Sequence, residues 1–432
     1  MKLLLHVCGI VLSFFLMTIP VVADMSGTHI LIHSQHITED ESTIEDGSGD
    51  TYYSYSNGFT FDGNLVIWNT YRLKKVPPKN VSSTLWMMNL TDEQTQILAT
   101  APSPEHRYMF DTPFGIADGS VVWSEDFNIY VYDSTFRDAY ALTTDGAHVD
   151  LSVQRENRDP VIDGDRVVWV KRMPYSSDDD GIVLYNLTSR TLQEFPVGPG
   201  RKSSPAMDGS RIVWSDKRKE PEGGDIYLFD FNRNEEISLC AASDIQQHPG
   251  ISGNYVVWED FRDGNPAIYL YNLSSGTEHR ISENNLMALA SMPYLSGNYA
   301  VWTEYSVLDK TRDESRRIIV YNILTGEREL FLPDTPQKVL WDFHDNRILY
   351  SDSDNTSLKD GYVHLFVIDS PVSGSLPTLT ATSTGSGNFT NPTENTQAPV
   401  PTRAASVSVV PLAVASLMLS ALVWHQSNRR IP

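Results

Sequence analysis

Cysteine is nearly missing from this chain, and its two cysteines are far apart. The 432-residue sequence contains only Cys8 and Cys240. Cys8 falls in an apolar N-terminal stretch that we expect to be removed, so Cys240 is the only cysteine expected in the mature chain. An internal disulfide and a zinc site made of clustered cysteines are therefore excluded. Core packing and strand pairing must hold the fold together.

Positive charge is also scarce. The chain has 33 lysines and arginines against 55 aspartates and glutamates, a formal net charge of −22. Nucleic acid and anionic lipid both require a cationic surface, so neither is expected as a partner. The acidity suits solubility at a cell exterior or the capture of cations.

Common catalytic motifs are absent as well. The sequence has no Gly-x-Ser-x-Gly nucleophile elbow, no His-Glu-x-x-His zinc motif and no phosphate-binding glycine loop. Its histidines are scattered. On these grounds we predict that the chain is not an enzyme and that it needs no cofactor, with Ca²⁺ left open.

A ten-residue phrase that begins with Pro and ends with Trp recurs along the chain. Its clearest copies are 160–169, 205–214, 249–258 and 293–302, and looser copies end at Trp68, Trp123 and Tyr350. Successive end residues lie 55, 46, 45, 44, 44 and 48 positions apart. A period near 45 in strand-rich sequence is typical of propeller blades. The fold class predicted is all-β, a seven-bladed β-propeller.

Each repeat supplies four short strands. A Gly-Asn, Asp-Gly or Gly-Asp pair separates the first two apolar runs, as in a tight hairpin turn. A third run such as 268–271, a turn such as 272–276 and a fourth run such as 278–281 follow. Four antiparallel strands per repeat make one blade.

The last repeat is incomplete. It has candidate strands near 339–343, 346–351 and 364–369, and the sequence then turns polar. The segment 29–33 is apolar and precedes the first full repeat. We expect it to supply the missing fourth strand, because an open ring would leave unpaired strand edges.

The aromatic residue that ends each phrase has two interpretations. A binding stripe for sugars or bases is one, and a wedge that packs neighbouring blades together is the other. Large aromatics at the end of a blade strand most often fill such wedges, so we favour packing. The predicted packing anchors are Trp68, Trp123, Trp169, Trp214, Trp258, Trp302 and Tyr350.

Charged residues follow the anchors in register. Carboxylates stand two places after an anchor, and arginines stand four places after several of them. A ring of carboxylates for Ca²⁺ or a polar ligand is one interpretation. Local carboxylate–guanidinium pairs that orient the loops are the other, which we favour. The candidate binding residues on this face are Asp216, Arg218, Asp260, Arg262 and Glu304.

The two ends of the chain predict a tethered surface protein. Residues 1–23 have the basic start and apolar body of a secretory signal, and 24–370 form the propeller. Residues 371–403 are a disordered stalk rich in Thr, Ser and Pro. Residues 404–424 are uncharged and long enough to span a bilayer, and 425–432 form a basic cytoplasmic tail. Cleavage of this last helix by a sorting enzyme is the alternative to its retention.

Asn-x-Ser/Thr sequons are frequent. N-glycosylation is one interpretation, and ordinary turn chemistry is the other, because Asn and Ser are common turn residues. Three of the sequons share one repeat position, just after the third strand. The candidate sites are Asn80, Asn89, Asn186, Asn272, Asn355 and Asn388.

The repeat resembles a known family. Residues 249–262 (PGISGNYVVWEDFR), followed by 268–273 (IYLYNL) and Gly276, resemble the TolB-type propeller repeat, and more narrowly its version in surface proteins of methanogenic archaea. The likeness covers roughly 58–370. The resemblance implies a role in protein interaction or surface assembly and supplies no site residues.

We therefore expect a single-pass cell-surface protein with its propeller outside the cell. Its expected function is that of a non-enzymatic scaffold for adhesion, envelope assembly, or recognition of an extracellular protein or glycan. The alternative is a hydrolase or lyase that acts on surface polysaccharide at the mouth of the propeller channel. The loops that differ between repeats are where recognition is expected.

Overall fold

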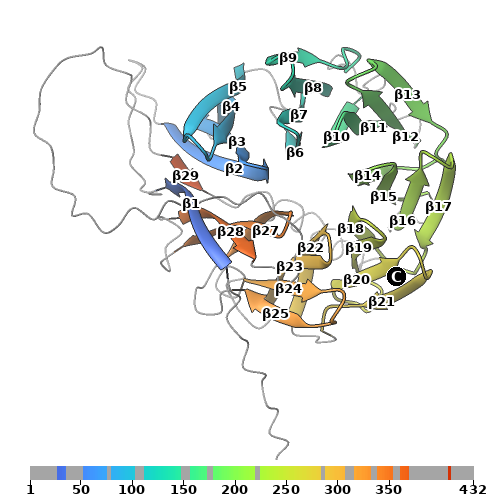
Figure 1. Ribbon diagram of the computed structural model, residues 1–432. Coiled ribbons are helices and arrows are strands. Elements are labelled where there is room, and N and C mark those ends of the chain that lie inside the picture. The colour runs from blue at the N-terminus through green and yellow to red at the C-terminus, as the bar shows by residue number, and fades with distance from the viewer. Residues whose placement is uncertain are drawn as a thin grey trace, which may run out of the picture.

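The computed structural model shows a ring of antiparallel sheets (Figure 1). It describes residues 27–35, 52–74, 79–102, 111–146, 156–172, 179–218, 224–283, 288–306, 316–331, 338–353, 361–368 and 407–409. Every helix or strand assigned within these ranges is a strand. The predicted all-β propeller of four-stranded antiparallel blades is thus confirmed.

The described strands form seven sheets, each a blade of the ring. In six blades the chain runs from the innermost strand outward. These blades are β2 (Tyr52–Asp62), β3 (Leu65–Lys74), β4 (Lys79–Asn89), β5 (Gln94–Pro102); β6 (Asp111–Ala117), β7 (Ser120–Glu125), β8 (Asn128–Asp133), β9 (Asp138–Ala141); β10 (Glu156–Asp163), β11 (Arg166–Arg172), β12 (Asp180–Asn186), β13 (Thr191–Phe195); β14 (Lys202–Asp208), β15 (Arg211–Asp216), β16 (Asp225–Asp230), β17 (Glu235–Cys240); β18 (Gln246–Ser252), β19 (Tyr255–Asp260), β20 (Ala267–Asn272), β21 (Thr277–Arg280); and β22 (Ala288–Ser296), β23 (Tyr299–Ser306), β24 (Arg317–Asn322), β25 (Arg328–Phe331).

The last blade joins the two ends of the described ring. It consists of β26 (Val339–His344), β27 (Arg347–Ser353), β28 (Gly361–Ile368) and β1 (Gly27–Gln35). β1 pairs with β28 in antiparallel fashion, so the N-terminal segment is the outer strand of the last blade. This is the place that the sequence predicts for 29–33.

The aromatic anchors form wedges between blades. Trp214 packs with Val168, Val170 and Ile182 of the preceding blade, and Trp258 packs in the same way on its own preceding blade. The ring closes with Trp68 against Leu349 of the last blade. All seven anchors are buried, so they offer no open stacking surface.

The repeated Pro follows a bulge in the innermost strand. The strand register shifts near the start of β10, β14, β18 and β22. The residue before the Pro has a positive φ there: Asp159, Ser204, His248 and Met292. A residue with left-handed backbone followed by Pro bends the strand locally, and the strand pairs regularly again after the bulge. The phrase therefore encodes a bulge, a turn and a wedge.

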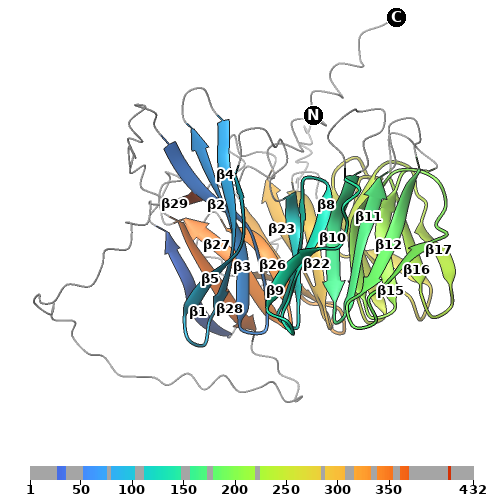
Figure 2. The ribbon, with the colours of Figure 1, turned by 90° about the horizontal axis from the view of Figure 1, so that it is seen from above.

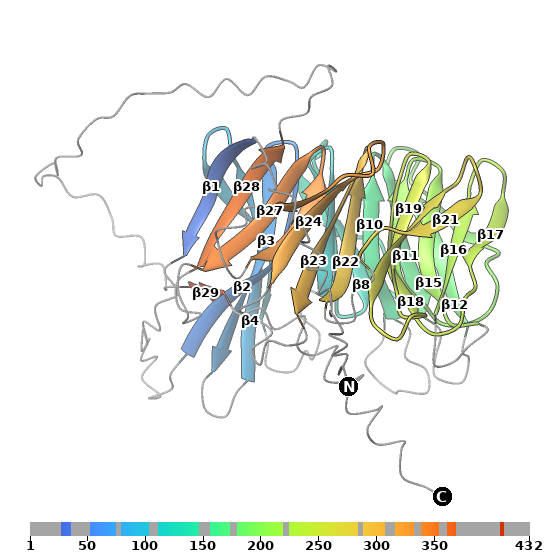
Figure 3. The ribbon, with the colours of Figure 1, turned by 90° about the horizontal axis from the view of Figure 1, so that it is seen from below.

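Two faces of the ring can now be distinguished. The turn face carries the tight turns between the first and second strands of each blade, and the loop face carries the connections between the second and third strands. The strands of the first blade are unusually long, and β2 and β4 project beyond the other blades on the loop face (Figures 2 and 3). A short strand, β29 (Val407–Val409), pairs in parallel with the projecting part of β2.

The predicted signal segment 1–23 and the predicted stalk and tail lie outside the described residues. Of the predicted membrane span 404–424, only β29 is described, as a strand. Within the described part of the chain, no helix has the length and apolarity to cross a membrane. The membrane anchor and the cell-surface location stay predictions.

Candidate functional site

Asp260 and Arg262 form the pair that the sequence predicts. Asp260 is fully buried and accepts hydrogen bonds from Arg262 Nε at 2.9 Å and Nη2 at 2.6 Å. The indole Nε1 of Trp258 donates to the same carboxylate at 2.8 Å. The Arg262 guanidinium also donates to Glu278 and lies 4.2 Å from the ring centre of Tyr269. The pair is thus one part of a larger internal cluster.

The preceding blade repeats this cluster. Arg218 donates to Asp216 and Glu236, and it stacks 3.9 Å above Tyr227. Trp214 Nε1 donates to Asp216 at 2.8 Å. Burial alone would lower the pKa of Arg218, but its hydrogen bonds to Glu236 and Asp216 raise that pKa above the usual arginine value. We call these two sets the Arg–carboxylate clusters.

Glu304, for which the sequence predicts no partner, pairs with an arginine of the outer strand. It is buried, and both of its carboxylate oxygens lie 2.7 Å from Nη2 of Arg328, on the outer strand β25. Burial raises the pKa of Glu304, whereas Arg328 and Arg317 lower it. No arginine stands four places after Trp302, so the outer strand supplies the guanidinium instead.

The five predicted binding residues therefore make internal contacts in three neighbouring blades. Lys202 belongs to the same network: its buried Nζ donates to the carbonyl oxygens of Gly198 and Gly200 and lies 3.5 Å from Asp216 Oδ2. Burial lowers the pKa of Lys202. These contacts tie inner, second and outer strands together. A direct role of the five residues in ligand binding stays a prediction.

The sequons at the end of the third strand have turn geometry. Asn89, Asn186 and Asn272 each accept a backbone N–H from the turn that follows. Asp133 and Asp230 accept the same kind of bond in blades without a sequon. The shared position is thus explained by the turn. Asn80 lies on β4, Asn355 and Asn388 lie outside the described residues, and glycosylation at all six stays a prediction.

His248, on the innermost strand of the fifth blade, pairs with Glu259 on the second strand, a pairing that the sequence does not predict. His248 Nδ1 lies 3.1 Å from Oε2 of Glu259, and the backbone N–H of Met292 donates to the same oxygen at 3.2 Å. The Glu259 side chain is 1% exposed and that of His248 is 31% exposed. The contact with the buried carboxylate engages Nδ1 and leaves the other ring nitrogen, Nε2, outside this pair. Its only sequence signal is His at the bulge position of the repeat.

A second group missed from the sequence lies on the turn face. Asp62, His344 and Asp345 each offer one ligand atom, and these atoms lie within 4.8 Å of one another. Within the described ranges this is the one such group of three metal-ligating side chains. The expectation of an absent cofactor, with Ca²⁺ open, is not tested by this geometry.

The chain matches no family model, and no curated protein matches it either. Solved structures do match. The acylaminoacyl peptidase of Pyrococcus horikoshii is 15% identical, with a TM-score of 0.51, and the match covers 73% of this chain and 51% of the peptidase. A puromycin hydrolase is 10% identical with a TM-score of 0.52, covering 73% of this chain and 52% of the hydrolase. A putative TolB from Agrobacterium tumefaciens is 18% identical with a TM-score of 0.40, covering 58% and 88%.

These likenesses establish the fold alone, and the chain spans about half the length of the two enzymes. They nevertheless contradict the prediction that the chain is not an enzyme. That prediction rested on absent motifs, and the solved chains with this fold include a peptidase and a hydrolase. A propeller therefore does not argue against an enzyme. The narrower likeness to methanogen surface proteins stays a prediction.

Proposed function

We propose that the chain is a propeller of the TolB-like repeat type, held at the cell surface by its C-terminal segment, that binds an extracellular protein or glycan on its loop face. The observation that carries this proposal is the asymmetry of the ring. Six blades have short strands, whereas the first blade projects β2, β3 and β4 beyond the loop face (Figure 2). A rigid scaffold that carries one irregular element is a common arrangement for recognition.

The internal contacts support the same proposal. The buried anchors fix neighbouring blades to one another, and the Arg–carboxylate clusters fix the strands within their own two blades. Residues with such contacts are costly to recruit for a ligand, because a buried charge that loses its partner is strongly destabilising. Recognition then falls to the parts that differ between blades, and the projection is the largest of them.

The experiment is a binding screen of the full chain against extracellular proteins and a glycan array. A variant in which 72–82 are replaced by a two-residue turn between the paired Tyr71 and Ser83 removes the projecting ends of β3 and β4. The matched control is Arg190→Ala, at the β12–β13 turn on the opposite face. We expect the shortened variant to lose the partner at least tenfold and the control to keep it. Equal binding by both variants would place recognition elsewhere.

A second candidate is a hydrolase or lyase that acts on surface polysaccharide, favoured by the His248–Glu259 pair. An imidazole held by a buried carboxylate is a typical general base. Activity of the full chain on a panel of acidic and neutral polysaccharides should then fall at least a hundredfold in His248→Ala, since a positioned base contributes about 10²–10⁴-fold to a rate. Turnover that survives this change, or no turnover on any polysaccharide, counts against this candidate.

A further inference from the structure

Neighbouring blades are joined on the turn face by one recurring hydrogen bond. The last residue of an inner strand accepts the backbone N–H of a turn residue in the next blade, through a carboxylate or a hydroxyl oxygen. These bonds, 2.5–3.0 Å long, are Asp118 N to Asp62, Gly209 N to Asp163, Gly253 N to Asp208, Gly297 N to Ser252 and Asp345 N to Ser296. The acceptor position is thus normally Asp or Ser.

Two of the seven junctions depart from this rule: β6 ends in Ala117, whose side chain has no acceptor, and the last blade differs at its junction with the first one. The acceptor position at the end of β26 is His344, which is neither a carboxylate nor a hydroxyl. Arg347 donates there to the carbonyl oxygen of Gly63, as Arg166 does to that of Gly209. Asp342 also joins the two blades, because it accepts from Thr60 and from the backbone N–H of Phe61. Among the described inner strands, only β26 ends in His. This strand faces Asp62 across the junction between the last and first blades, which we call the seam.

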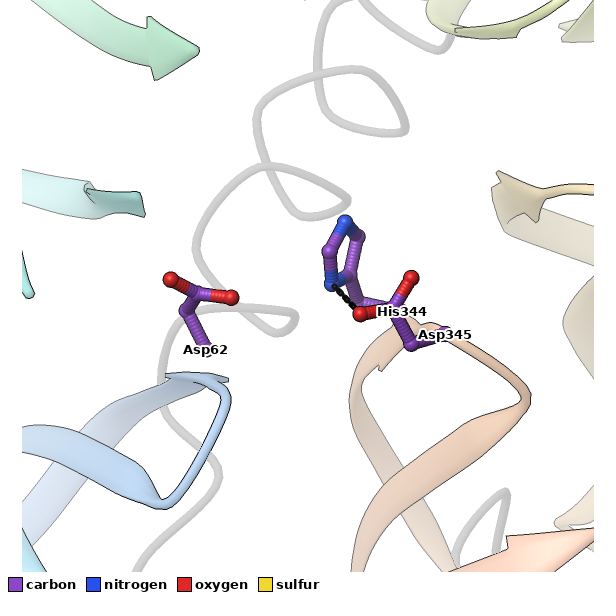
Figure 4. Close-up of side chains that lie close together, drawn as sticks. All are labelled: Asp62, His344 and Asp345. Atoms are coloured by element: carbon purple, nitrogen blue, oxygen red, sulfur yellow. Dashed lines mark ion pairs between the residues drawn. The ribbon is translucent and has the colours of Figure 1, made fainter. Parts of the chain in front are cut away.

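Figure 4 shows the side chains at the junction where His344 takes the place of Asp or Ser. The Asp62 carboxylate points across the seam toward the imidazole of His344, and Asp345 lies beside that ring. One ligand atom from each of the three residues lies within 4.8 Å of the other two. His344 Nδ1 and Asp345 Oδ2 are 3.4 Å apart, and their side chains are 51% and 58% exposed, so both can rotate. Asp62 is held in place by the N–H of Asp118.

Charge and donor type restrict the ligand of this cluster. Two carboxylates and a neutral imidazole carry two negative charges, and Arg347, whose Nη2 is 3.9 Å from Asp345, offsets about one of them. The remaining charge attracts a cation. Calcium and magnesium prefer oxygen ligands alone, whereas zinc and other divalent transition metals accept an imidazole with carboxylates.

We propose that Asp62, His344 and Asp345 bind a divalent transition-metal ion of the Zn²⁺ or Mn²⁺ type, which clasps the first and last blades together. Metal–ligand bonds of about 2.0–2.2 Å place neighbouring ligand atoms roughly 3 Å apart. Small rotations of the two exposed side chains close the present spacing to that value. Three protein ligands leave further positions of the ion to water. The clasp joins the inner strands of the first and last blades, β2 and β26, which come from opposite ends of the ring's sequence.

The test is the melting temperature of the full, metal-stripped protein with and without added metal. Zn²⁺ or Mn²⁺ at a hundred times its dissociation constant should raise the melting temperature by about 4 °C for a ring of roughly 340 residues. Calorimetric titration should show one ion per chain. Mg²⁺ should produce no comparable rise.

Three variants separate a built site from stray binding. His344→Gln changes an exposed side chain and should abolish the metal-dependent rise, as should Asp62→Asn. Asp208→Asn is the matched control: Asp208 accepts a turn N–H as Asp62 does, but from Gly253 and with no part in the cluster. This control should keep the full rise in melting temperature, even if its metal-free melting temperature falls as far as that of Asp62→Asn.

Two results would overturn the proposal. One is a metal-dependent rise that is the same in wild type, His344→Gln and Asp62→Asn, which means an adventitious ion only. The other is no rise and no calorimetric binding in the wild-type protein with either Zn²⁺ or Mn²⁺.

Discussion

Replacing Asp260 by Ala is the sharpest test of the Arg–carboxylate clusters. The change leaves Trp258 Nε1, on a side chain with 0% exposure, without its acceptor. It also removes three hydrogen bonds that Arg262 donates, from its backbone N–H, Nε and Nη2. An unsatisfied buried donor costs about 1–3 kcal/mol, and breaking a buried ion pair costs about 3–5 kcal/mol. The two effects share the same carboxylate, so we expect a total of about 4 kcal/mol rather than their sum.

The expected loss converts to a measurable shift. An unfolding entropy near 2.1 cal/mol/K per residue over about 340 residues means that about 4 kcal/mol lowers the melting temperature by about 6 °C. Differential scanning calorimetry or fluorimetry measures this shift. The matched control is Glu194→Ala, which breaks the ion pair with Lys171 at a side chain that is 58% exposed. Such a surface pair is worth about 1 kcal/mol or less, so the control should fall by about 1 °C. The reasoning is refuted if Asp260→Ala melts within 2 °C of wild type.

The remaining predictions use the same measurements. Gly200→Ala should be far more destabilising than Gly209→Ala. A Cβ on Gly200 (φ +99°) would lie 2.6 Å from the Cα of Arg218, whereas a Cβ on Gly209 (φ +59°) would meet nothing within 4 Å. Equal melting temperatures of the two variants would contradict this prediction. Burial raises the pKa of the Cys240 thiol to about 12, so at pH 8 a thiol reagent should label this residue only when the protein unfolds. The stability of the fold should decrease as the pH rises from about 8.5 toward 12, because the unfolded chain loses the thiol proton first. Rapid labelling of the native protein would show that the thiol is accessible. Deleting 24–36 removes β1 from its pairing with β28 and should sharply lower the melting temperature; an unchanged value would mean that β1 does not close the ring.

The sequence predicted the features that recur at a fixed period. The Gly-containing turns, the β-branched second strands and the aromatic wedges each appear several times in register, so one copy supports the next. The pairing of Asp216 with Arg218 and of Asp260 with Arg262 followed from the same register. Local spacing was sufficient here, because both members of each pair lie on one short segment.

The contacts of the outer strands could not be predicted in this way. Glu236 and Glu278 complete the two Arg–carboxylate clusters, and Arg328 pairs with Glu304. The equivalent places on the other outer strands are Thr95, Ala139 and Leu192, so the repeat does not predict a charged residue there. The partner of Glu304 lies on the outer strand, so the local spacing offered no partner for it. The seam cluster was missed because its members come from the first and last repeats, which match the phrase least well and meet only after the ring has closed.

The same contrast bears on where function lies. Residues that recur along the ring have recurring structural partners: the anchors are buried in all seven blades, and the turn-face hydrogen bonds join five of the seven junctions. A residue that breaks the repeat and still gains specific partners needs another explanation. His248 at a bulge and His344 at the seam are two such residues, and the projection of the first blade is the corresponding departure in the backbone. They lie on different blades, so the variants that test them act independently. Shortening the projection should therefore abolish only partner binding, and His248→Ala should abolish only turnover. His344→Gln should abolish only the metal-dependent rise in melting temperature.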